Sequence, residues 1–171
     1  IAEDVAANLT QPPFDASAMD GYAVRHADLS ANGETTLAVV GSAFAGKPYS
    51  GAIGKGECVR IMTGGVVPAA MDTIIMQEHT RAAGGKVTIG PGHRKNQNLR
   101  RAGEDLARGG VALARGKLIG PADIGLLASL GIAEAAVFRK LRVAFFSTGD
   151  ELVSIGAPLG EGQIYDSNRY T

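Results

Sequence analysis

Two adjacent prolines, Pro12 and Pro13, constrain this chain more than any other feature. Proline fixes its own backbone dihedral and has no amide donor, so the pair cannot lie inside a helix or a central strand. The following residues include aspartates and a serine that hydrogen-bond nearby amides, then an Asp-Gly turn at Asp20, then the apolar run Tyr22–Val24. We therefore predict a constrained, acidic loop over residues 12–24, which is a candidate functional site.

The composition limits the classes of protein and partner. A chain of 171 residues can form one large or two small domains with a sizeable core. Its 17 basic residues balance 17 acidic ones, so no net charge attracts it to nucleic acid or to an anionic membrane, and we expect neither partner. No run of about 18 apolar residues is present, so no membrane span is expected.

The only cysteine is Cys58, which lies in an apolar run beside Val59 and Ile61. One cysteine excludes an internal disulfide, and it fits a reducing compartment such as the cytoplasm. We predict that Cys58 is a buried core thiol.

Short β-rich segments follow the loop at regular spacing, and many of the 24 glycines bound them as tight turns. This pattern predicts a small β-barrel or sandwich over residues 35–95. The predicted strands are Thr35–Val40, Glu57–Met62, Asp72–Met76 and Lys86–Ile89.

A basic, glycine-rich connector over residues 96–116 precedes the clearest helix, Pro121–Leu130. Proline in the first turn, Asp123 near the positive end and Gly131 at the stop are typical helix signals. Residues 1–9 are ambiguous, because they contain helix formers but few apolar residues.

The C-terminal part predicts an α/β arrangement. A short strand, Ala135–Arg139, leads to Arg142–Phe146, whose continuous apolar character is typical of a parallel strand buried on both faces. The loop Ser147–Glu151 then lies at the carboxyl end of that strand, where ligands bind in open α/β sheets. This strand has little to pack against within its own chain, so we expect Val143, Phe145 and Phe146 to be disordered, held by a partner or prone to association.

We interpret the chain as a fragment. It begins at Ile1 without a methionine, and residues 165–168 resemble the N-cap of a helix that would need residues after Thr171.

Three carboxylate positions are candidates for chemistry: Asp20, Asp105 and the pair Asp150-Glu151. Each lies in a glycine-flanked loop, where a carboxylate can face a cation or a water molecule. Turn formation or capping is the alternative role for such aspartates. Thr63 ends a strand at a glycine turn, so its hydroxyl and the following amides either hold an oxyanion or belong to an ordinary turn.

Two arginines, Arg100 and Arg101, precede Glu104 and Asp105. Their guanidinium groups either contact the oxygens of a phosphate or molybdate, or form surface ion pairs with these acids. The three histidines have no metal-binding spacing, so zinc is not expected, and Mg²⁺ held by carboxylates is the metal chemistry that remains.

Four ordered segments then identify a family resemblance. They are PPFDASAMDGYAV at residues 12–24, VRIMTGG at 59–65, NLRRAGED at 98–105, and FSTGDEL at 146–152 running on to GQIYDSN at 162–168. In this order they resemble the molybdopterin molybdenumtransferases, the family of MoeA and the gephyrin E-domain. The resemblance covers nearly the whole chain.

The resemblance implies a multi-domain α+β fold with four parts: an irregular N-terminal segment, a small β-barrel-like domain, a helical connector and the first strand of a truncated α/β domain. Residues 1–34 and 96–140 are expected to form one discontinuous linker domain, with an extended segment at residues 1–9. Residues 35–95 would form the β-domain, and residues 141–171 would begin the molybdopterin-binding α/β domain.

The resemblance also implies a function, the insertion of molybdate into adenylylated molybdopterin during molybdenum cofactor synthesis. Asp20 and Asp105 match motif aspartates, which implies catalytic roles and Mg²⁺ binding for both. Substrate-binding roles are implied for Thr63, Arg101, Ser147, Thr148, Asp150 and Glu151.

The family further implies a cytoplasmic homodimer, with molybdopterin adenylyltransferase as a possible partner. The C-terminal half of the family's pattern is missing here, so this chain alone is expected to be inactive. Two alternatives stay open: a non-catalytic dimerisation or scaffold module of a gephyrin-like protein, and a tungsten-specific homologue.

Overall fold

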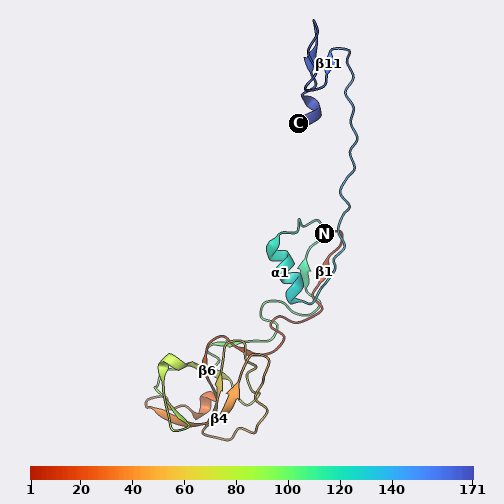
Figure 1. Ribbon diagram of the computed structural model, residues 1–171. Helices are drawn as coiled ribbons and strands as arrows, with labels where there is room; N and C mark the ends of the chain where they lie inside the picture. The colour runs from red at the N-terminus through yellow and green to blue at the C-terminus, as the bar shows by residue number, and fades with distance from the viewer. The chain divides into compact units, whose positions relative to one another are not determined.

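The computed structural model describes all residues, Ile1–Thr171, and the chain divides into two compact units, Ile1–Val137 and Phe138–Thr171 (Figure 1). The first unit contains three small β arrangements and the only α-helix. Its strands are β1 Val5–Ala6, β2 Ala16–Ser17, β3 Gly21–Val24, β4 Thr35–Ala43, β5 Glu57–Ile61, β6 Thr73–Met76, β7 Thr80–Ala83, β8 Lys86–Ile89, β9 Leu99–Arg100 and β10 Val111–Leu113. Its helices are η1 His26–Asp28, η2 Gln77–His79 and α1 Pro121–Ser129.

The largest element is a six-stranded sheet with the order β6-β3-β5-β4-β8-β7. Neighbouring strands are antiparallel except β4 and β5, which run parallel. The two end strands, β6 and β7, are joined only by η2, so the sheet must curl to bring its edges together. Figure 1 shows this curl around β4 and β6. The four predicted strands are confirmed, in a curled open sheet rather than a closed barrel.

The core of this sheet lies on both of its faces. Tyr22 and Val24 of β3 join a buried cluster on one face, and Ala23 joins a second cluster on the other. Side chains alternate across a strand, so a strand buried on both faces reads as a continuous apolar run. This strand belongs to the sheet although it lies outside the range 35–95 predicted for the β-domain. The boundary between that domain and a linker domain stays a prediction.

Cys58 lies in the first of these clusters and is fully buried, which confirms the predicted core thiol. Burial raises the pKa of the Cys58 thiol to about 12, because the charged thiolate is costly in an apolar environment. The thiol is therefore protonated at neutral pH and unreactive in the folded protein.

The helix α1 follows a short ladder in which β1 pairs antiparallel with β10. This pairing confirms the extended segment expected at residues 1–9. The carboxylate of Asp123 accepts the amide of Gly120 at 2.9 Å and the ammonium of Lys117 at 2.8 Å, which caps the helix start. At the other end the amides of Gly131 and Ile132 donate back into the last turn, and Gly131 adopts a φ of 68°. This is a Schellman ending, as the glycine signal predicted.

Gly125 gives a direct test of this helix, because it lies in the middle of α1 with a helical backbone. A Cβ there meets no atom within 4 Å. Gly125→Ala is therefore expected to stabilise the protein by about 0.5–1 kcal/mol, since alanine loses less backbone entropy on folding. Chemical denaturation measures the effect; a destabilised variant would show that this face of the helix is covered.

The second unit contains β11 Leu152–Val153, which pairs parallel with β12 Ile164–Tyr165, and the short helix η3 Asn168–Tyr170. The predicted strands Ala135–Arg139 and Arg142–Phe146 are wrong: neither range forms a strand. A strand needs a ladder of hydrogen bonds to a neighbour. The amide of Ala2 donates to the carbonyl of Ala136 at 2.8 Å, but no ladder forms with either range.

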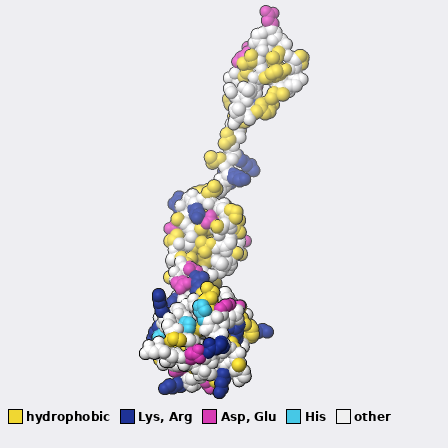
Figure 2. Space-filling view, turned by 90° about the vertical axis from the view of Figure 1, so that its left-hand side faces the viewer, with side chains coloured by type: hydrophobic (Ala, Val, Ile, Leu, Met, Phe, Trp, Pro, Cys, Tyr) yellow, Lys and Arg dark blue, Asp and Glu magenta, His cyan; other side chains and the backbone are white.

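Exposed apolar side chains are the consequence. Val143 and Phe146 are 79% and 87% exposed, and Phe145 is also exposed, which confirms the expected lack of cover. Figure 2 shows apolar side chains in yellow on the surface of the second unit. Across the whole chain, the one α-helix is too short to cross a bilayer.

Candidate functional site

Asp20 and Thr63 come from separate motifs, and the sheet brings them together. Asp20 immediately precedes β3, and Thr63 is the second residue after β5. These two strands pair so that Gly21 lies opposite Ile61. As a result, Oδ1 of Asp20 accepts two hydrogen bonds from Thr63, one from its amide and one from its hydroxyl, both at 2.8 Å. Both are predicted site residues.

The hydrogen bonds from Thr63 lower the pKa of Asp20, the amide most and the hydroxyl next, and the charge of Arg60 adds a smaller effect. The carboxylate is therefore ionised at neutral pH. Arg60 is itself held in place, because its guanidinium lies 5.0 Å from the centre of the Tyr22 ring and donates to the carbonyl of Gly21 at 3.0 Å. A second nitrogen of Arg60 donates to the side chain of Gln77.

The glycine turn after β5 does not present free donors for an oxyanion. The amide and hydroxyl of Thr63 are taken by Asp20, the amide of Gly64 donates to the carbonyl of Ser17 at 2.9 Å, and the amide of Gly65 donates to the carbonyl of Met62 at 2.8 Å. In this structure these groups orient Asp20 and the neighbouring loop, and the oxyanion role of Thr63 stays a prediction.

Thr63→Val tests the electrostatic part of this arrangement. Valine has the shape of threonine without the hydroxyl, so Asp20 keeps the amide donor and loses the other. We expect the pKa of Asp20 to rise toward its ordinary value of 3.8. An aspartate whose pKa is lowered by folding stabilises the folded protein at pH values above its ordinary pKa. This stabilisation is lost as the pH falls through the pKa of the folded protein. Because that pKa is higher in Thr63→Val, the variant should lose the stabilisation at a higher pH.

NMR titration of the Asp20 carboxyl carbon measures this pKa. Thr63→Ser is the matched control, because it keeps the hydroxyl and should leave the pKa lowered. Equal values in the wild type and Thr63→Val would show that the hydroxyl does not act on Asp20.

Asp105 lies in a different environment from Asp20. Its carboxylate accepts Nη2 of Arg100 at 2.6 Å, while Nε of Arg100 donates to Glu104. Its amide donates to the carbonyl of Gln11 at 3.1 Å. The two predicted catalytic aspartates therefore have no hydrogen-bond partner in common, and Arg100 takes the ion-pair role that the sequence left open.

No cluster of side chains in this chain forms a metal site by itself, because no group of three or more His, Cys, Asp or Glu is arranged to hold a metal. Mg²⁺ is usually held by one or two carboxylates, with water and substrate phosphates completing its octahedral geometry. One oxygen of Asp20 and one of Asp105 already accept hydrogen bonds. Mg²⁺ binding by Asp20 and Asp105 is therefore not supported by this chain alone and stays a prediction for the full-length protein.

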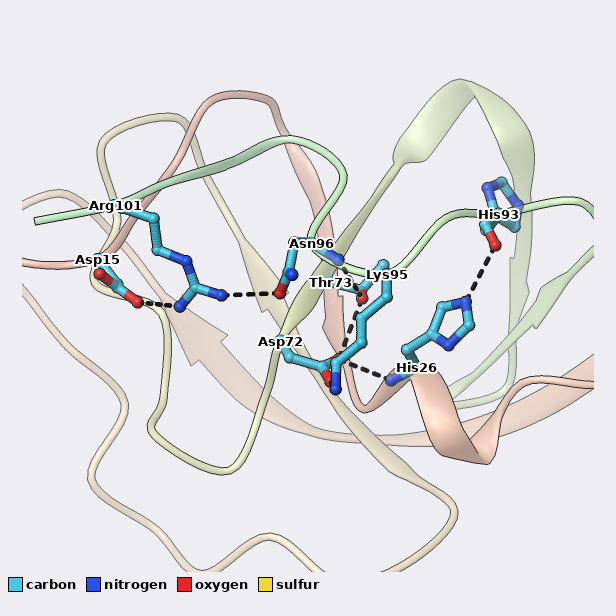
Figure 3. Close-up of polar contacts among 8 residues, drawn as sticks. All are labelled: Asp15, His26, Asp72, Thr73, His93, Lys95, Asn96 and Arg101. Carbon is cyan, nitrogen blue, oxygen red and sulfur yellow. Dashed lines mark hydrogen bonds and ion pairs between the residues drawn. The ribbon is translucent and has the colours of Figure 1, made fainter. Parts of the chain in front are cut away.

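Arg101 also forms an ion pair. Its Nη1 donates to Oδ2 of Asp15 at 2.7 Å and its Nη2 donates to Oδ1 of Asn96 at 2.7 Å (Figure 3). Sequence reasoning missed the contact of Asp15 with this arginine, although its place in the acidic loop marked it as a polar loop residue. A substrate contact for Arg101 stays a prediction.

The predicted residues of the second unit are only partly gathered. Ser147 donates its hydroxyl to Asp166 at 2.5 Å, and both line a cavity of about 330 Å³. Thr148, Asp150 and Glu151 are exposed and do not line this cavity. Sequence reasoning missed Arg169, which does.

The three histidines gather in the first unit, although their spacing gave no sign of it. His26 Nε2 lies 3.0 Å from the carbonyl oxygen of His93, and the rings of His79 and His93 stack with centres 6.3 Å apart. Burial and the neighbouring His79 lower the pKa of His93, so its ring is neutral at pH 7. They therefore pack as neighbours within the fold.

Comparison with known proteins places the chain in a family. Residues 1–131 match the MoeA N-terminal region, domain I and II. The chain is 48% identical over 171 residues to a molybdopterin molybdenumtransferase of Haemophilus influenzae, covering 99% of this chain and 42% of that protein. It is 42% identical over 168 residues to molybdopterin molybdenumtransferase 2 of Mycobacterium tuberculosis, covering 96% of this chain and 42% of that protein.

A solved structure is similar as well. The molybdopterin biosynthesis MoeA protein of Pyrococcus horikoshii OT3 matches with a TM-score of 0.88 at 32% identity, covering 97% of this chain and 45% of that chain. The present chain thus spans less than half the length of these relatives. By the match over residues 1–131, the chain belongs to the MoeA family, in its N-terminal region.

Proposed function

We propose that this chain supplies part of the active site of an enzyme that inserts molybdate into adenylylated molybdopterin with release of AMP. The observation that carries the proposal is the contact between Asp20 and Thr63, which joins two separate motifs into one exposed, ionised carboxylate. Relatives over the whole chain that are named molybdopterin molybdenumtransferase support the choice of reaction.

The geometry favours a binding and orienting role for Asp20. Thr63 fixes Oδ1, so the carboxylate holds one orientation and its other oxygen is left to accept a hydrogen bond from the substrate. An acceptor that is oriented before the substrate binds costs little reorganisation during the reaction. We give Mg²⁺ no step, because no cluster of side chains in this chain holds a metal by itself.

The remaining parts of the proposal concern the full-length protein. Asp105, held by Arg100, is proposed as a second catalytic residue, and the cavity beside Ser147 as part of the substrate site. A homodimer in the cytoplasm, with molybdopterin adenylyltransferase as a further partner, follows from the family resemblance; light scattering on the full-length protein measures the dimer.

The experiment uses a full-length protein that contains this sequence and is as long as its relatives. Purified adenylylated molybdopterin is supplied with molybdate, with tungstate or with neither anion, and AMP release and bound metal are measured together. Molybdate-dependent AMP release with molybdenum retained is the expected result. Activity with tungstate but not with molybdate would mean that tungstate is the substrate. Inactivity with both anions would favour a scaffold role.

A further inference from the structure

The short strand β2, Ala16–Ser17, is held between two segments that carry proposed site residues. On one side it pairs antiparallel with β9, and the amide of Ala18 donates to the carbonyl of Asn98 at 2.9 Å. On the other side the amide of Ser17 donates to the carbonyl of Gly65 at 3.0 Å. The first segment, residues 98–105, ends at Asp105, and the second, residues 65–67, begins two positions after Thr63. The strand β2 therefore fixes the two segments relative to each other.

The side chain of Asp15, just before β2, strengthens the contact with the first segment. Its Oδ2 accepts a hydrogen bond from Nη1 of Arg101 at 2.7 Å, and its Oδ1 accepts one from the amide of Ala102 at 2.9 Å. Its backbone carbonyl accepts the amide of Val67 at 2.9 Å, in the second segment. The amide of Ala102 lowers the pKa of Asp15, as does Arg101, so the carboxylate is ionised at neutral pH. One residue thus contacts both segments.

Arg101 continues this network toward the sheet. Its Nη2 donates to Oδ1 of Asn96, and the amide of Asn96 donates to the hydroxyl of Thr73 at 3.2 Å. Thr73 is the first residue of β6 and is fully buried. Asn96 has a φ of 64°, a backbone conformation that needs support from its surroundings. Figure 3 shows the contacts running from Asp15 through Arg101 and Asn96 to Thr73.

We infer that Asp15 is a positioning residue for the proposed insertion reaction, which acts through Arg101 and Ala102 to fix the segment that carries Asp105 relative to Asp20 and Thr63. This inference rests on the proposed function. Asp15 and Arg101 are partly exposed, and ion pairs of this kind contribute little to global stability. Their effect is therefore expected in the geometry of the site, where small displacements of a reacting group are costly.

The variants Asp15→Asn and Arg101→Gln test this role in the full-length protein. Asparagine keeps the shape of Asp15 but loses its charge, so the contact with Arg101 weakens. Glu34→Gln is the matched control: Glu34 pairs with Arg81 at 2.6 Å, also at the surface, and its partner lies in β7, outside both segments. Steady-state kinetics of molybdenum insertion, thermal unfolding and amide hydrogen exchange are measured on all variants.

We expect Asp15→Asn and Arg101→Gln each to lower kcat by roughly 10- to 100-fold, with little change in KM and in the melting temperature. The double variant should be no slower than the slower single variant, because both changes remove one contact. Exchange at the amides of Ala102, Gly103 and Asp105 should become faster. Glu34→Gln should match the wild type in each measurement.

A kcat of Asp15→Asn equal to that of the wild type would overturn the inference. So would a loss of activity that follows a large fall in melting temperature, or losses that multiply in the double variant. If the wild type itself inserts no molybdate, the proposed function fails, and amide exchange then decides the positioning role: unchanged protection at Ala102 and Asp105 in Asp15→Asn overturns it.

Discussion

Asp20→Asn in the full-length protein is expected to lower molybdate insertion by at least ~10²-fold while the melting temperature stays close to that of the wild type. Asparagine keeps an oxygen that accepts the amide and hydroxyl of Thr63, so the local structure is preserved. The negative charge is lost, and with it the oriented anionic acceptor. Rates of AMP release and molybdenum incorporation measure the effect.

Asp28→Asn is a suitable control for this prediction. Like Asp20, Asp28 is an aspartate of the first unit that accepts a backbone amide, that of Gly56 at 3.0 Å, but it lies at η1 and contacts neither Asp20 nor Thr63. Its activity should equal that of the wild type. A fully active Asp20→Asn variant would remove Asp20 from the mechanism, and a strongly destabilised one would assign it a structural role.

Gly21→Ala is expected to destabilise the protein by about 3 kcal/mol or more, the upper range for overpacking in a core. A Cβ at Gly21 would lie 1.9 Å from the carbonyl oxygen of Ile75 and 2.8 Å from its carbonyl carbon. These are backbone atoms of β6, which pairs with β3, so only a separation of the two strands relieves the clash. The melting temperature should fall by roughly 6–12 °C.

Gly90→Ala provides the comparison, because a Cβ at Gly90 meets nothing within 4 Å. It should unfold within about 2 °C of the wild type. A Gly21→Ala variant that is as stable as the wild type would mean that β3 and β6 are not in close contact.

The strands of the sheet could be predicted because their signals are local. Lys86–Ile89 is bounded by glycine turns and alternates polar with apolar residues, and β8 has the same bounds. Arg142–Phe146 carried a stronger apolar signal and still forms no strand. The difference is the partner: β8 pairs with β4 and β7, whereas no segment of this chain pairs with residues 142–146. An apolar run indicates burial, but pairing decides whether a strand forms.

The site was predictable in its residues and not in its contacts. Asp20 and Thr63 are 43 positions apart, and only the pairing of β3 with β5 brings them together. The same limit explains why the contact between Asp15 and Arg101 was missed, since these residues are 86 positions apart. The sequence left two roles open for Thr63, because a sequence does not reveal which acceptor takes an amide; in this structure the acceptor is Asp20.

A double-mutant cycle on kcat tests most directly whether Asp20 and Thr63 act as one centre. Asp20→Asn, Thr63→Val and the double variant are compared with the wild type in molybdate-dependent AMP release by the full-length protein. If Thr63 acts by orienting Asp20, the double variant should be about as slow as Asp20→Asn alone. Losses that multiply in the double variant would show that the two residues act independently, and would contradict the single carboxylate centre proposed for this fold.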